Sequence, residues 1–241
     1  MMRCRPVSSI ADAIAQMEGV GAALPAADGL AAFNRMYLGV TQAVQARIVG
    51  SFFADAGFMS RLDVVFANLY FAAADASLSG ASELPRAWAP LLQRRQDPSV
   101  APIQFALAGM NAHINHDLPQ AVVDTCQQAG TAPGAPPHHD DYQKVDPILE
   151  AAEQQVRESF ESGAVASADK AVAPVANVVC NWSIAEARNA AWTNALALWV
   201  LRGHSTLEAD YLDALAGTVG LASRGLLAPT PGDLLTAVRS V

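Results

Sequence analysis

Two histidines, an aspartate and two asparagines lie close together in an otherwise apolar stretch of the sequence, residues 109–119. His113 and Asp117 are four residues apart, and His116 follows His113 by three. In a helix, residues at these spacings are neighbours, so their side chains can reach one point in space. An imidazole and a carboxylate placed in this way can share a divalent metal ion or form a hydrogen-bonded acid/base pair. A buried hydrogen bond without a catalytic role has the same spacing, so the pattern leaves three interpretations open.

The residues around this cluster predict one long helix over 102–129, because good helix formers dominate and apolar side chains recur at helical spacing. Pro119 has no N–H group, so the carbonyl of Asn115 would lose its helical partner and the helix is expected to bend there. Gly109 is small enough for another helix or a ligand to approach closely. Asn111, in the same stretch, is a candidate for binding substrate.

Further carboxylates come from other parts of the chain. Asp63 belongs to a predicted helix over 59–76 and is either a buried partner or a surface charge. Asp141 ends a titratable run, 138–141, that follows an irregular stretch at 131–137. That run is either the tip of a polar loop or a source of further ligands or a lid. We take Asp63 and Asp141 as candidates to complete a metal site with His113, His116 and Asp117.

Tryptophans recur along a long helix predicted from about residue 174 to 202. Trp182 and Trp192 lie on one stripe of this helix, and such a stripe is usually part of a core. They are also candidates, together with Tyr70, for shaping a substrate pocket.

Glu186 lies at the edge of the same stripe. A carboxylate against indole rings in a dry site binds its proton more tightly, so Glu186 is a candidate general acid or a further metal ligand. Arg188 is expected to project elsewhere.

Three segments of this chain together resemble a bacterial family catalogued only as a domain of unknown function. They are GMNAHINHDLP at 109–119, RLDVVFANLYF at 61–71 and WSIAEARNAAW at 182–192. The resemblance extends from about residue 33 to 227. It implies that the three segments belong to one helical domain, and it carries no activity that could be transferred to this chain.

Composition favours an all-α fold. The chain of 241 residues is 52% hydrophobic, enough to bury a sizeable core. Alanine is abundant and alternating strand patterns are absent, which favours helices. We expect residues 1–241 to form a single-domain helical bundle of about seven or eight helices, with 28–228 as its core.

Several classes of protein are disfavoured. The net charge of −8 argues against a nucleic-acid-binding surface, which needs clustered Lys and Arg. Three scattered cysteines indicate neither a disulfide framework nor a thiolate zinc site. No phosphate-binding glycine motif points to a nucleotide cofactor. No apolar run is long enough for a membrane span, and we read no signal peptide. We therefore expect a cytoplasmic protein that acts on a small molecule, and the sequence leaves its oligomeric state open.

Three functions fit the pattern. The first is a metal-dependent, hydrolase-like enzyme using Zn, Mn or Fe, in which metal-bound water becomes the nucleophile; helical zinc hydrolases of phosphoesters also use an HxxxD pair. The second is a metal-free cyclase, isomerase or dehydratase acting on an apolar, natural-product-like substrate, with His113 and Asp117 as its acid/base pair. The third is a binding protein without chemistry, in which the cluster is a satisfied polar network.

Overall fold

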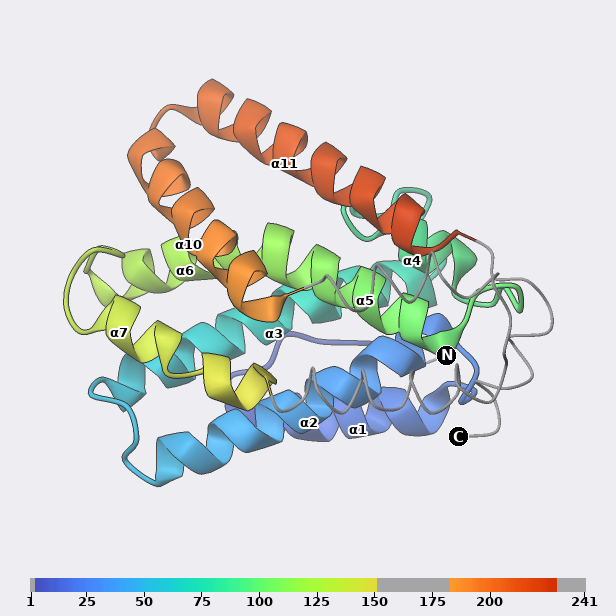
Figure 1. The fold of residues 1–241 in the computed structure, drawn as a ribbon, viewed down its shortest axis with the longest axis horizontal. Coiled ribbons are helices and arrows are strands. Elements are labelled where there is room, and N and C mark those ends of the chain that lie inside the picture. Colours follow the sequence, from blue (N-terminus) through green and yellow to red (C-terminus); the bar gives the residue numbers. More distant parts are fainter. Residues whose placement is uncertain (1–2, 151–182, 229–241) are drawn as a thin grey trace.

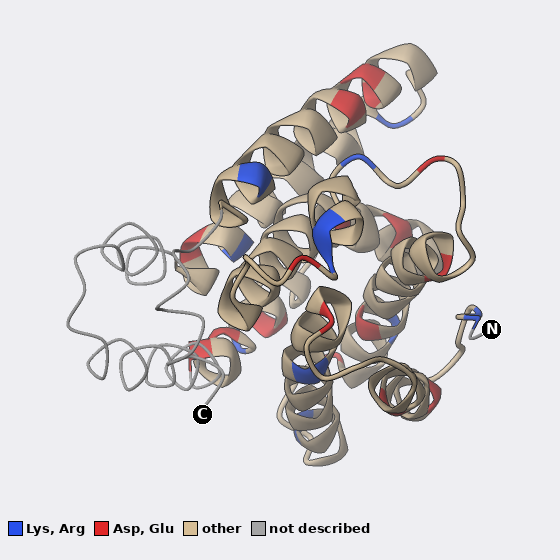
Figure 2. Ribbon diagram, turned by 90° about the vertical axis from the view of Figure 1, so that its right-hand side faces the viewer, with Lys and Arg blue, Asp and Glu red and all other residues tan. Residues whose placement is uncertain are grey.

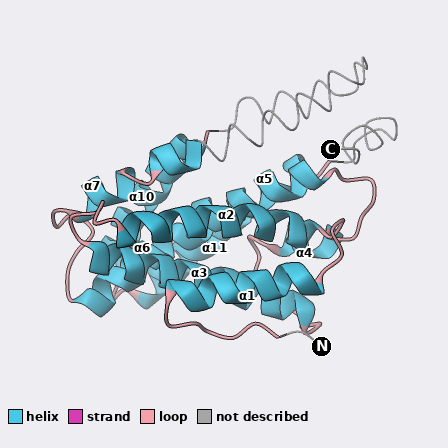
Figure 3. Cartoon of the chain, turned by 90° about the horizontal axis from the view of Figure 1, so that it is seen from below, coloured by secondary structure: helices cyan, strands magenta, loops and turns pink. Residues whose placement is uncertain are grey.

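The structure, a computed structural model, describes residues 3–150 and 183–228, and no described residue lies in a strand (Figure 3). Its helices are α1 (Ile10–Ala23), α2 (Gly29–Val49), α3 (Ala56–Leu78), α4 (Ala89–Arg94), α5 (Pro102–Ala112), η1 (His113–Asp117), α6 (Leu118–Ala129), α7 (His138–Gln143), α10 (Ile184–Leu201) and α11 (Ser205–Leu226). Counting α5, η1 and α6 as one continuous helix gives eight helices in the described ranges. The predicted all-α bundle is confirmed.

The continuous helix α5–η1–α6 is the element around which the others pack (Figure 1). Its first half contacts α2 and α11, and its second half contacts α3 and α10. Helix α1 packs against α2 and α3. The short segment η1 lies where the two halves meet, and it also touches α3, α10 and α11. Side chains of η1 are therefore placed near the centre of the bundle.

Helix boundaries follow local capping signals. Side-chain oxygens of Ser9, Asp28 and Asp55 accept N–H groups in the first turns of α1, α2 and α3, which would otherwise lack partners. Helix α6 ends at Gly130, whose φ of 65° suits a residue without a Cβ.

One predicted helix differs from the structure where it can be compared. Ser183 has an extended backbone and caps α10, which begins at Ile184, so the helix predicted from about residue 174 is not continuous through residue 183. Its part before Ser183 lies outside the described residues.

Close packing against the central helix depends on glycine at two positions. A Cβ added at Gly109 of α5 would overlap the ring of Phe33 from α2, and one added at Gly29 would overlap Phe105. Both phenylalanines are 1% exposed, so they have little space to move aside. The expectation that Gly109 permits a close approach is confirmed, and the neighbour is the side chain of Phe33.

Charged positions are distributed over several helices of the described ranges and leave most of the ribbon uncharged (Figure 2). None of the helices in residues 3–150 and 183–228 combines the length and apolar character that crossing a bilayer requires.

Candidate functional site

The histidines and the aspartate lie in a π-helical turn. Within η1 the backbone bonds shift by one residue, so the N–H of Leu118 donates to the carbonyl of His113 instead of Ile114. Pro119 follows directly and cannot donate. The wider turn accommodates the proline inside a continuous helix, at the point where the sequence predicts a bend. Single π turns within α-helices occur frequently at functional sites.

Asp117 is the common acceptor for three side chains. Its Oδ2 accepts from Trp88 Nε1 at 2.9 Å and from His113 Nδ1 at 3.0 Å. Its Oδ1 pairs with His116 Nδ1 at 2.8 Å. Asp117 is 3% exposed and His113 is 2% exposed, so water does not compete for these bonds. The predicted His113–Asp117 contact therefore exists, and His116 reaches the opposite oxygen of the same carboxylate.

The network fixes the protonation of its members. Burial by itself would raise the pKa of Asp117, but hydrogen bonds from His113 and His116 outweigh it and hold this pKa below its usual range. Burial lowers the pKa of His113 more than Asp117 raises it. At neutral pH the carboxylate is thus ionised and the imidazole of His113 is neutral. Since an ionised carboxylate only accepts, His113 carries its proton on Nδ1 and has a lone pair on Nε2.

Aromatic rings hold the imidazole of His113 in place. It stacks on Phe66 with a centroid distance of 3.5 Å and an angle of 3° between the rings. Tyr37 meets it edge to face at 4.5 Å, and Phe33 does so at 5.7 Å. The ring is therefore held on its faces and edges by α2 and α3, while Asp117 fixes its Nδ1.

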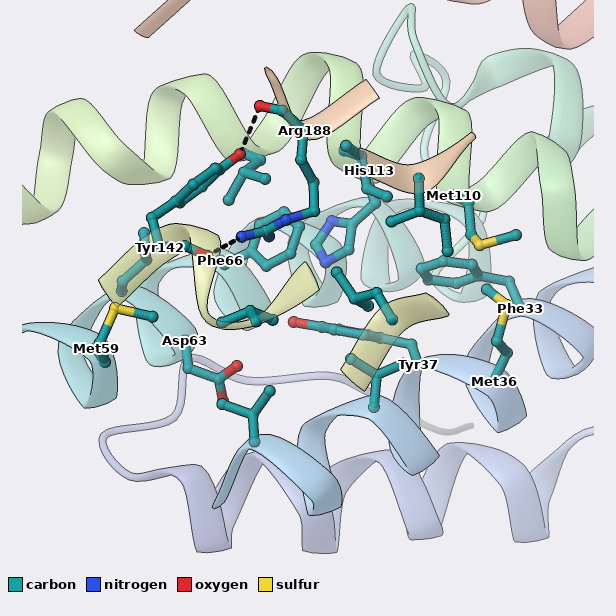
Figure 4. Close-up of a pocket in the computed structure, with 18 residues that line it drawn as sticks. Phe33, Met36, Tyr37, Met59, Asp63, Phe66, Met110, His113, Tyr142 and Arg188 are labelled. Atoms are coloured by element: carbon teal, nitrogen blue, oxygen red, sulfur yellow. Dashed lines mark hydrogen bonds between the residues drawn. The ribbon is translucent and has the colours of Figure 1, made fainter. Parts of the chain in front are cut away.

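The other side of His113 borders a cavity of about 80 Å³ between α2, α3, the central helix and α10 (Figure 4). Most of the lining is apolar and includes Met36, Met59 and Met110, whose flexible side chains adapt to the shape of a ligand. The polar side chains in the lining are Tyr37, Asp63, His113, Tyr142 and Arg188.

Three polar atoms of this lining are closed to solvent and have no hydrogen-bond partner. They are Nε2 of His113, Oδ2 of Asp63 and the hydroxyl of Tyr37. In the view of Figure 4, the hydroxyl end of Tyr37 lies between His113 and Asp63. Buried polar groups are nearly always paired, because an unpaired group costs about 1–3 kcal/mol. Three such atoms from residues of one cavity indicate a place for a polar ligand.

Burial also changes the acidity of the two residues that face His113. It raises the pKa of Asp63 to about 7, so this carboxyl exchanges its proton near neutral pH. Burial, together with the nearby Asp63, raises the pKa of Tyr37 well above its usual value, which keeps its phenol protonated. The sequence left open whether Asp63 is a buried partner or a surface charge. The structure places this residue at the cavity, partly exposed, with its Oδ2 closed to solvent.

Arg188 reaches the cavity although the sequence predicted that it projects elsewhere. Its Nε donates to Asp146 at 2.6 Å, and its Nη2 donates to the carbonyl of Tyr142 at 2.5 Å. Its guanidinium lies 3.9 Å from the centroid of the Tyr142 ring. Its charge is therefore compensated inside the protein. Sequence reasoning missed Arg188 because it expected this side chain on another face of α10. In the structure the buried residues of α10 include Ile184, Ala187, Arg188, Ala191 and Ala195.

Glu186 lies on the outside of the same helix. It is exposed, and its backbone N–H donates to the Ser183 cap. The indole of Trp192 is buried against His139 and Tyr142, each at 4.7 Å between ring centroids, and does not line the cavity. Trp182 lies outside the described residues.

Two more candidates for binding substrate support the bundle instead of the cavity. Asn111 donates to the carbonyl of Val219 and to Ser223 Oγ, both at 2.9 Å, which ties α5 to α11. Tyr70 donates to Asn34 at 2.9 Å within the core. Neither side chain lines the cavity.

The run at 138–141 forms the start of α7 and is not a loop. Asp141 is fully buried and accepts the N–H groups of Ala54 and Asp55 at 2.9 and 2.6 Å. It also pairs with Lys144 at 2.8 Å. Burial opposes its charge, but the bond from Lys144 and the two amides outweigh this and lower its pKa. Asp141 therefore anchors the chain before α3 and does not line the cavity.

The predicted metal ligands do not converge on one point. Within the described residues there is no group of three or more His, Cys, Asp or Glu side chains that could hold a metal ion. His113 and His116 direct Nδ1 at different oxygens of Asp117, so these contacts are hydrogen bonds between would-be ligands. This arrangement gives no support to the predicted metal site, which stays a prediction.

Fold and site together define a class: an all-helical bundle in which a buried His–Asp pair, formed at a π turn, borders an apolar cavity. The chain belongs to a family of unknown function, DUF5995, whose sequence model matches residues 10–229. The expectation that the chain belongs to a family catalogued only as a domain of unknown function is thereby confirmed. No match was found among curated proteins, and none among solved structures.

Proposed function

We propose that this protein is an enzyme that moves protons on a small, apolar molecule, as an isomerase, cyclase or dehydratase does. The observation that carries the proposal is the set of three unpaired polar atoms, on His113, Asp63 and Tyr37, at one apolar cavity. An enzyme pocket of this kind is mostly apolar and has a few polar groups that fix and activate the substrate.

His113 is suited to act as the general base. Its Nε2 lone pair borders the cavity, and its Nδ1–H is held by the ionised Asp117. When Nε2 takes a proton from the substrate, the carboxylate stabilises the imidazolium that forms. A third group that orients the base and offsets its charge in this way is a recurring device in acid/base catalysis.

Asp63 is suited to act as the matching acid. Its pKa of about 7 allows it to hold a proton at neutral pH and to release it readily. It comes from α3, whereas His113 comes from the central helix, so the two groups face the cavity from different walls. Two titratable groups with different surroundings at one site are the usual basis of an acid/base division of labour.

A metal-dependent hydrolase is the second function expected from the sequence. The lone pairs of Asp117 already accept three N–H donors, so this residue would have to give up bonds in order to ligate an ion. No contact in the described residues favours this candidate over proton transfer, and the experiment below includes a test for it.

Deuterium incorporation tests the proposal without knowledge of the substrate. The protein is incubated in D₂O with a mixture of apolar metabolites, and mass spectrometry detects molecules that gain deuterium or are converted. We expect conversion by the wild type, a loss of roughly 100-fold or more in His113→Gln, and full activity in excess chelator. Glu186→Gln is the matched control, since Glu186 is exposed. Circular dichroism verifies that His113→Gln is folded, and Asp63→Asn gives a second, independent loss.

Three outcomes contradict the proposal. A wild type that changes no molecule supports a binding protein, activity that chelator removes supports the metal-dependent alternative, and undiminished activity in folded His113→Gln places the chemistry elsewhere.

A further inference from the structure

The hydrogen-bonding character of His113 limits what the cavity can bind. Because Asp117 takes the Nδ1–H, the nitrogen at the cavity, Nε2, is an acceptor and has no proton to give. A ligand that satisfies it must offer an O–H or N–H group. A molecule with a carbonyl or ether oxygen alone would leave Nε2 unpaired.

The groups on the facing walls have the opposite character. The phenol of Tyr37 keeps its proton and can donate it, and the carboxyl of Asp63 can donate when it is protonated. The rings of Tyr37 and His113 are 4.5 Å apart between centroids, so one small group can contact both. A hydroxyl meets both demands with one oxygen, since it donates to Nε2 and accepts from Tyr37.

Charge balance argues against an ionic ligand. Among the described lining residues Arg188 is the cation, and it is paired with Asp146 at 2.6 Å, so these residues offer no free positive charge to an anion. Asp63 would repel an anion whenever it is ionised. A cation would have to give up its water for a carboxyl that is partly protonated at neutral pH, and an unpaired buried charge is costly.

The cavity also limits the size of the ligand. Its volume of about 80 Å³ is smaller than the roughly 150 Å³ of a cavity that accepts benzene. Rearrangement of the methionines in the lining can enlarge it for a compact molecule of five or six heavy atoms.

We infer that the cavity binds an uncharged, compact apolar alcohol, whose hydroxyl donates to Nε2 of His113 and accepts from Tyr37. This inference rests on the proposed function, because it names the substrate class of the same site.

Five probes of five or six heavy atoms test the inference on the full chain by NMR titration: cyclopentanol, cyclopentanone, cyclopentane, cyclopentylamine and, as the anion, butyrate. We expect cyclopentanol to bind about 5- to 10-fold more tightly than cyclopentane, which corresponds to one or two net hydrogen bonds. Cyclopentanone should fall between them, and the two ions should bind most weakly.

Two tyrosine variants locate the effect. Tyr37→Phe removes the hydroxyl donor at the cavity while the bond to Nε2 of His113 remains, so it should reduce the preference for cyclopentanol over cyclopentane to about 2- to 3-fold. Tyr70→Phe is the matched control, because its buried hydroxyl bonds to Asn34 outside the cavity, and it should leave the ranking unchanged.

The inference is overturned if no probe binds, if cyclopentane binds as tightly as cyclopentanol, if either ion binds best, or if Tyr37→Phe leaves the preference for the alcohol intact. Its failure is distinct from that of the proposed function, since binding is measured without turnover. A protein that prefers the alcohol but converts nothing in D₂O would be a binding protein for alcohols.

Discussion

Asp117 is a buried carboxylate and Asp63 is a partly exposed one whose Oδ2 is closed to solvent, and their surroundings are opposite. Asp117 accepts from three N–H groups, and its pKa is lowered. Oδ2 of Asp63 has no partner, and the pKa of its carboxyl is raised to about 7. The first carboxylate is a fixed charge that orients other groups, whereas the second is a group that can exchange a proton. Hydrogen bonding, more than depth of burial, separates a structural carboxylate from a reactive one.

The largest effect should come from removing the fixed charge. Asp117→Leu leaves the N–H groups of Trp88, His113 and His116 without their acceptor, and breaking a buried charged network typically costs about 3–5 kcal/mol. Urea unfolding at neutral pH measures this loss. Asp117→Asn is the matched control, because its amide oxygen keeps one acceptor and should restore part of the stability. A loss below about 1 kcal/mol would mean that Asp117 is not the centre of the network.

Removing the exchangeable carboxyl should instead stabilise the protein. As the pH rises above about 4, the usual value for aspartate, the unfolded chain releases the Asp63 proton while the folded protein keeps it up to a pKa of about 7. Wild-type stability therefore falls across this window and then levels off.

Asp63→Asn removes this penalty. We expect the variant to equal the wild type near pH 4 and to exceed it by about 3–4 kcal/mol at pH 8, because the pKa of Asp63 differs by about three units between the folded and unfolded states. Urea unfolding at several pH values measures the difference. A difference that does not change with pH would show that Asp63 titrates normally, and the comparison with Asp117 would then fail.

Much of the fold follows from local signals in the sequence. The single long helix predicted over 102–129 is present as α5, η1 and α6, and the start of α2 is set by Asp28, a residue type that favours the N-cap. These features depend on neighbours along the chain, through helical periodicity and caps. The exact register of the π turn was not visible, because it depends on how Pro119 is accommodated by packing around η1.

The site was predictable in part. The His113–Asp117 contact depends on helical spacing alone, so it was found. The roles of Trp88 and Tyr37 depend on contacts between distant helices, and no spacing rule reveals them. The sequence placed Glu186 near the site and Arg188 away from it, and the structure shows the reverse. The error arose because α10 carries apolar residues on most of its circumference. Its buried face is therefore set by the helices it meets and not by its own pattern.

The smallest effect should come from His116, which links the fixed charge to the proposed base. His116 shares Asp117 with His113, so its N–H draws electron density from the carboxylate that holds Nδ1 of His113. His116→Leu removes one donor and leaves Asp117 a stronger partner for His113. The pKa of His113, which burial lowers in the wild type, should therefore rise. The stability cost should be about 1 kcal/mol, because the side chain of His116 is 16% exposed and water can replace part of its bond. Imidazole NMR titration reads the pKa of His113 directly, and an unchanged or lower pKa would show that His116 does not act through Asp117.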